Sequence, residues 1–164
     1  MNKFIQAVDG LSEYSGRIVA YLIIPLILTI VYSTLIRFFF NIVVDWAFEM
    51  SMFMNGIMVM VGGAYTLKYK AHVRVDVITH YLGPAMNRRL DILSFVIIIA
   101  VCLVLTYFGG KAAWVSTLRL EYSSLQTPFN PQIWWYKWFI PFSASLLALQ
   151  ALVECMRTIK SKDQ

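Results

Sequence analysis

Four long apolar runs restrict the possible folds of this chain more strongly than any other feature. A run of about 20 apolar residues is long enough for an α-helix to cross the roughly 30 Å hydrocarbon core of a bilayer. The expected spans are 18–40, 46–67, 92–114 and 134–153. A barrel would instead need many shorter strands of alternating polarity. The expected fold is therefore an all-α integral membrane protein with four transmembrane helices, forming one membrane domain over residues 1–164.

The composition agrees with a membrane protein. Hydrophobic residues make up 59% of the chain and charged residues only 14%, whereas soluble domains are about 45–50% apolar and about 25% charged. The net charge is +5, and the charged residues are clustered between apolar runs. This distribution favours a role in membrane topology over nucleic-acid binding. Cys102 and Cys155 stand in different segments without a CxxC motif, and we expect both to be packing residues.

Basic residues are distributed unevenly between the two sides of the predicted membrane domain. Ten of the 14 lysines and arginines lie in the N-terminal segment, the loop between spans two and three, and the C-terminal segment. The other four are Arg37, Lys111, Arg119 and Lys137. Because basic loops stay in the cytoplasm, both termini are expected there. The N-terminal segment has a helical apolar stripe, so it is expected to form an amphipathic helix that can lie flat on the cytoplasmic surface.

Several residues predict where the spans begin and bend. Pro25 and Pro141 lie inside the first and fourth spans and are expected to kink them. Asp45 is expected to cap the second span, with Trp46 beside it at the membrane interface. Pro84 is expected in the first turn of the helix that leads into the third span.

Two ionisable residues lie close to the ends of spans, where charges are functional candidates. Arg37 ends the first span and Glu49 begins the second, and the hairpin between them is short. Both side chains should therefore lie at similar depth near the outer interface. An ion pair with each other or with a partner subunit is expected, and the sequence leaves that choice open.

Small residues predict helix-packing surfaces on the second and fourth spans. Glu49, Gly56 and Gly63 are seven residues apart and share one helix face. A neighbouring face carries Ser51, Asn55, Gly62 and Thr66, and the fourth span carries Ala144, Ala148 and Ala151. Because small residues let helices approach closely in lipid and asparagine can bond across them, the second span is expected to contact partners rather than form a transport path.

The basic stretch "KYKAHVRVDVI" after the second span raises the question of a metal site. His72, Asp76 and His80 follow helical spacing, but no fourth ligand is identifiable, so neither a metal nor another cofactor is expected. Arg74 is instead expected to form a cytoplasmic clasp, bonding to Asp76, to helix-end carbonyls or to a partner carboxylate. No histidine lies in a span to bind haem or to activate a nucleophile, so the chain is not expected to be an enzyme.

These pieces together resemble the small membrane subunit of tripartite ATP-independent periplasmic (TRAP) transporters. The likeness covers nearly the whole chain. It consists of Arg37 at the end of span one, Trp46-x-x-Glu49, "GGAYTL", "AHVRVDV" and the Trp–Lys–Ile–Pro segment followed by Gln150. The stretch "AHVRVDV" after an apolar helix is the most specific part.

The resemblance implies a division of labour. A periplasmic binding protein captures an organic acid, such as sialic acid or a C4-dicarboxylate, and a large membrane subunit holds the substrate and sodium sites. The small subunit would be a scaffold partner in the bacterial inner membrane, surrounded by lipid and without a substrate site of its own. The alternative is a stand-alone small exporter acting as an oligomer, which would need an acid near the middle of the bilayer.

Overall fold

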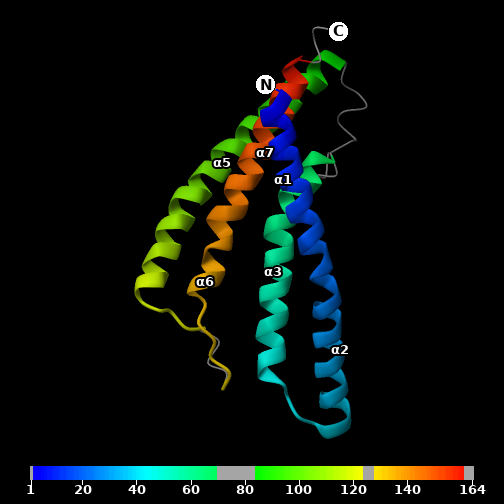
Figure 1. Cartoon of the computed structure of the whole chain (residues 1–164), viewed down its shortest axis with the longest axis vertical. Coiled ribbons are helices and arrows are strands. Elements are labelled where there is room, and N and C mark those ends of the chain that lie inside the picture. Colours follow the sequence, from blue (N-terminus) through cyan, green and yellow to red (C-terminus); the bar gives the residue numbers. More distant parts are fainter. Residues whose placement is uncertain (1, 70–83, 124–127, 161–164) are drawn as a thin grey trace.

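The computed structural model describes residues 2–69, 84–123 and 128–160, and its named elements are helices (Figure 1). They are α1 (Asn2–Tyr21), α2 (Ile23–Phe40), α3 (Asp45–Lys68), α5 (Pro84–Leu118), α6 (Trp134–Lys137) and α7 (Phe139–Lys160). Four stretches are long and apolar enough to cross a membrane: Ile5–Phe40, Asp45–Lys68, Met86–Leu118 and Trp134–Lys160. These observations confirm the predicted all-α fold with four membrane helices.

Both intramembrane prolines interrupt their helices as predicted. Pro25 has no N–H to donate to the carbonyl four residues earlier, and α1 ends there, at Tyr21. In the same way, α6 ends at Lys137, four residues before Pro141. Each proline therefore sets the joint between a helix and its continuation, α1 to α2 and α6 to α7.

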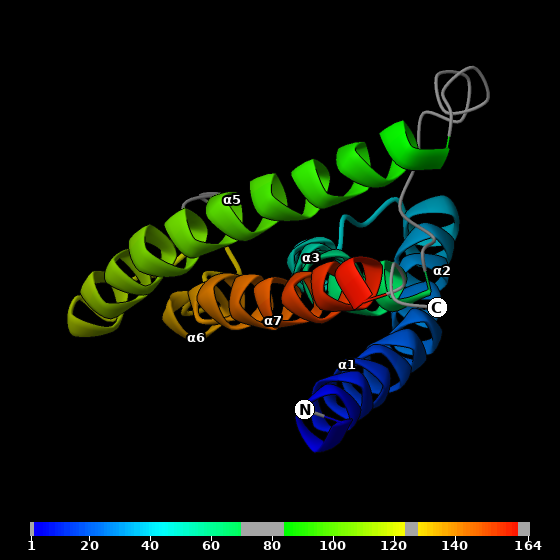
Figure 2. The ribbon, with the colours of Figure 1, turned by 90° about the horizontal axis from the view of Figure 1, so that it is seen from above.

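Helix α7 lies at the centre of the bundle. It packs against α5, α3 and α1, and the view from above places it between α5 and α1 (Figure 2). Its small residues Ala144, Ala148 and Ala151 are all buried, which confirms the predicted packing stripe. Beside them, Leu67, Phe95 and Ala151 form a buried apolar cluster that joins α3, α5 and α7.

Helix α2 is the opposite case, because it buries none of its side chains. It packs on α3 and joins it through a turn at the end of the bundle far from the start of α1 and the end of α7 (Figure 1). Apart from exposed Thr34 and Arg37, its remaining surface is mostly apolar and faces away from the bundle, where it can contact lipid or another membrane protein.

Two details differ from the sequence-based predictions. Helix α1 does not stand apart as a surface helix: it continues the line of α2 and packs along α3 and α7 (Figure 1), because its polar side chains find partners there. Asp45 does not cap α3; it is the first residue of that helix, after Val44. A carboxylate in the first turn still interacts favourably with the helix dipole.

Candidate functional site

A polar network joins α1 to α7 near the end of the bundle where α1 begins. The Gln150 side chain of α7 is fully buried. Its amide oxygen accepts a hydrogen bond from Ser12 Oγ at 2.8 Å, and its amide nitrogen donates one to Asp9 Oδ1 at 3.1 Å. A buried amide is costly unless its donors and acceptors are satisfied. These bonds therefore fix the register of α1 against α7.

Ion pairs extend this network along α7 and across to α3. Arg157 contacts both Asp9 and Glu154, and the Glu154 side chain is only 4% exposed. Lys68, at the end of α3, lies 2.6 Å from Glu13 Oε2 and donates a hydrogen bond to the Asp9 carbonyl at 3.2 Å. Each charge in this network thus has a partner of opposite sign, and α1 is tied to both neighbouring helices.

Polar contacts also join the end of α5 and the residues that follow it to α6 and the residues beside it. Glu121 Oε2 lies 2.6 Å from Lys137 Nζ, and Trp138 donates its indole hydrogen to Thr117 Oγ1 at 3.0 Å. The Ile133 N–H also bonds to the Glu121 carbonyl at 2.9 Å. The hydrogen bond from Lys137 holds the pKa of Glu121 below its ordinary value of 4.5, so the Glu121 carboxylate is ionised at neutral pH.

An aromatic cluster shows how α3 meets α6. The Phe53 ring lies 5.6 Å from Trp135 and 4.9 Å from Tyr136, measured between ring centroids. A side chain at Gly56 would overlap the Tyr136 hydroxyl, whereas one at Gly63 would meet nothing within 4 Å. Gly56 therefore contacts a neighbouring helix of this chain, while half-buried Gly63 has open space at its Cβ position within the described structure, although the sequence grouped the two residues together.

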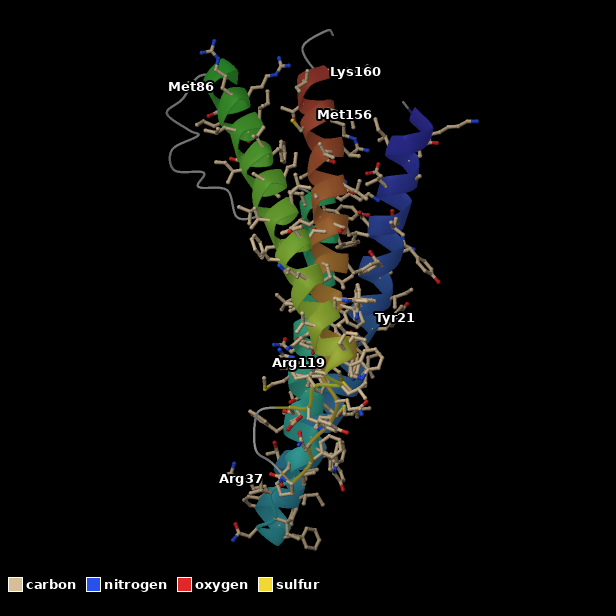
Figure 3. All side chains as sticks on the ribbon, turned by 90° about the vertical axis from the view of Figure 1, so that its left-hand side faces the viewer. Tyr21, Arg37, Met86, Arg119, Met156 and Lys160 are labelled. Atoms are coloured by element: carbon tan, nitrogen blue, oxygen red, sulfur yellow. The ribbon has the colours of Figure 1, made fainter. Side chains whose placement is uncertain are left out.

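Arg37, Glu49 and Trp46 lie around the α2–α3 hairpin. Arg37 is exposed near the end of α2, far from Met156 and Lys160 (Figure 3). Glu49 is only 1% exposed and lies on the inner side of α3. The Trp46 ring lies 5.9 Å from the Tyr32 ring, measured between centroids. The ion pairs among the described residues include none between Arg37 and Glu49. Their predicted mutual pairing therefore gains no support here, and pairing of Arg37 with a partner subunit stays a prediction.

The predicted clasp cannot be placed. Arg74 and Asp76 lie outside the described residues, as do His72 and His80 of the rejected metal site.

Sequence reasoning did not single out the charged network of α1, α3 and α7. The sequence does contain a signal for it. An otherwise apolar helix carries three polar residues at spacings of four and three: Gln150, Glu154 and Arg157. Asp9 and Glu13 are likewise four residues apart on α1. Residues at these spacings share one helix face, so a polar stripe on each helix indicates a contact between them.

Comparison with known proteins identifies relatives of the chain. The family model for the DctQ component of tripartite ATP-independent periplasmic transporters matches residues 26–161. A protein of Vibrio cholerae serotype O1, described as a C4-dicarboxylate TRAP transporter small permease protein DctQ, is 30% identical over 109 residues. That match covers 66% of this chain and 44% of the Vibrio protein, so the chain spans less than half the length of this relative.

Proposed function

The chain belongs to the DctQ family of TRAP transporter components, and from this premise we propose that it is a scaffold partner of the large membrane subunit, without a substrate site of its own. The family is one of transporter components, and the chain is a multi-pass protein of the bacterial inner membrane. In this proposal the assembled transporter couples sodium entry to import of an organic acid delivered by a periplasmic binding protein. The Vibrio relative is described for C4-dicarboxylates, which makes that class, beside sialic acid, the first to test.

The observation that carries this proposal is the outward face of α3. Asn55 is exposed near the middle of this helix, and within the described residues its amide makes no hydrogen bond. An amide facing hydrocarbon is costly, whereas an amide that bonds across a helix interface is stabilising. Val59 is 71% exposed on the same face, and no described side chain or neighbouring helix lies within 4 Å of a Cβ placed at Gly62 or Gly63. This face suits close contact with a helix of another membrane protein.

The proposal predicts different effects for two glycines of α3. Gly63→Leu should leave the thermal midpoint of the isolated chain unchanged, because the new side chain enters open space. It should reduce co-purification of the large subunit and substrate uptake on the order of tenfold, because it separates two helices that must approach closely. Gly56→Leu is the matched control, since it should destabilise the chain itself through Tyr136. Full assembly and uptake with Gly63→Leu would contradict the proposed docking face.

We also propose that both termini are cytoplasmic. The basic residues support this orientation, and α1 begins at the same end of the bundle where α7 ends (Figure 1). In a background of Cys102→Ala and Cys155→Ala, a cysteine at exposed Asn130 should react with a membrane-impermeant maleimide added to whole cells. A cysteine at exposed Lys160 should react only after the membrane is opened. The reverse pattern would invert the topology.

A further inference from the structure

A shallow groove of about 390 Å³ lies where the second half of α5 meets α6 and the segment before it. One part of its lining is apolar and comes from Phe108, Ala112 and Val115 of α5. The other part carries the charged side chains of Lys111, Glu121 and Lys137. The groove has an apolar wall and a charged rim and lies on a helix that crosses a membrane. This lining matches the amphipathic chemistry of a lipid better than that of a free small ion.

Lys111 is the residue that most needs an external partner. It lies on the exposed face of α5, near Tyr107, Phe108 and Trp114, which are 66%, 63% and 58% exposed. Among the described residues no carboxylate forms an ion pair with it, whereas Lys137 is paired with Glu121. A lysine on a lipid-facing helix is costly unless its amine reaches the headgroup region or an anion.

The position of Lys111 suits the boundary between hydrocarbon and headgroups. Leu118, the last residue of α5, lies seven positions after Lys111, which is about 10 Å along the helix axis. Three exposed aromatic side chains surround it, and aromatic residues gather at this depth in membrane proteins. Lys137, across the groove, follows Trp134 and Trp135. Both amines therefore stand beside aromatic residues of the kind that gather at the headgroup boundary.

We propose that this groove binds one anionic phospholipid of the surrounding bilayer. Its phosphodiester would lie between Lys111 and Lys137, and one acyl chain would follow Phe108 and Val115. The rim carries two cations and one anion, so its net charge complements an anionic headgroup better than a zwitterionic one. Because the proposal rests on the membrane location and on this groove alone, its test is independent of docking to the large subunit.

The test uses the full chain in detergent, supplied with equal amounts of phosphatidylglycerol and phosphatidylcholine, and counts bound lipids by native mass spectrometry. Wild-type protein should retain one phosphatidylglycerol in preference to phosphatidylcholine. Lys111→Gln should reduce that retention about fivefold, the effect of one lysine near an anionic membrane surface. Lys160→Gln, at an exposed lysine on the other end of the bundle, should bind as wild type does. An unchanged circular dichroism spectrum would show that each variant is folded.

A second variant tests whether lipid binding depends on the charge of the rim or is weakened by any substitution there. Glu121→Gln removes the anion and releases Lys137, so it should keep or increase phosphatidylglycerol retention. Loss of the lipid in Glu121→Gln, equal retention of both lipids by the wild type, or unchanged retention in Lys111→Gln would each overturn the proposal. It would also fail if Lys111→Gln weakened binding of the large subunit while lipid retention stayed constant, since Lys111 would then serve a protein partner.

Discussion

Gly16→Ala is expected to lower the stability of this protein, whereas Gly10→Ala, on the same helix, is expected to raise it slightly or leave it unchanged. A Cβ atom at Gly16 would lie 2.6 Å from the Cβ of Tyr65, while nothing lies within 4 Å of the same position at Gly10. The Tyr65 Cβ is fixed to the backbone of α3, so it cannot move aside as the tip of a long side chain can. α1 and α3 must therefore separate.

The two expected effects have opposite signs for a physical reason. Alanine is favoured over glycine inside a helix by about 0.5–1 kcal/mol, and this gain is available at both positions. At Gly16 it is outweighed by overpacking, which typically costs about 1–3 kcal/mol. Separation of the helices would also lengthen the contact between Glu13 and Lys68, which is 2.6 Å in the native bundle.

Thermal unfolding in detergent, followed by circular dichroism, measures both variants against the wild type. The midpoint should fall for Gly16→Ala and should not fall for Gly10→Ala. Equal shifts in the same direction would show that the contact between Gly16 and Tyr65 does not limit the approach of α1 to α3.

The helices themselves could be predicted from the sequence because length and hydropathy suffice for that step. A long apolar run must satisfy its backbone hydrogen bonds internally in lipid, and a helix does so. The breaks before Pro25 and Pro141 follow from the missing proline N–H in the same local way. Each of these predictions depends only on residues within a few positions of one another.

Apart from the alanine stripe of α7, the packed faces of the helices could not be predicted, because lipid is as apolar as a protein core. α2 is strongly apolar and yet buries no side chain, whereas α7, at the centre, carries buried Gln150 and Glu154. Small residues are equally ambiguous: a Cβ at Gly56 would meet Tyr136, whereas a Cβ at Gly63 would meet no other described part of the chain within 4 Å. Hydrophobicity therefore identifies a span without indicating which side of it packs.

The polar contacts between α1 and α7 could not be predicted either. Ser12 and Gln150 are 138 positions apart in the sequence, and their pairing depends on the register between the first and last spans. That register is set by the packing of several helices together, including the contact at Gly16. One sequence could reveal polar stripes on α1 and α7, but it could not show that the two stripes face each other.

Arg157→Met should destabilise this network, because Arg157 contacts two carboxylates at once. Removing its guanidinium leaves Glu154, whose side chain is 4% exposed, without its cation. A buried group that loses its partner typically costs about 1–3 kcal/mol. The Arg157 side chain is itself 40% exposed, so water can replace part of the interaction and an effect in the lower part of that range is expected.

A matched control and a rescue variant separate this electrostatic cause from lost packing. Lys160→Met removes an exposed cation from the same last turn of α7 and should leave the thermal midpoint close to that of the wild type. Adding Glu154→Gln to Arg157→Met should restore part of the loss, because a neutral amide is less costly to bury than an uncompensated carboxylate. If Arg157→Met behaved like Lys160→Met, or if the second change made the protein less stable still, the ion pairs would not be what holds α7 against α1. The buried hydrogen bonds of Gln150 to Ser12 and Asp9 would then be the principal polar contacts between these helices.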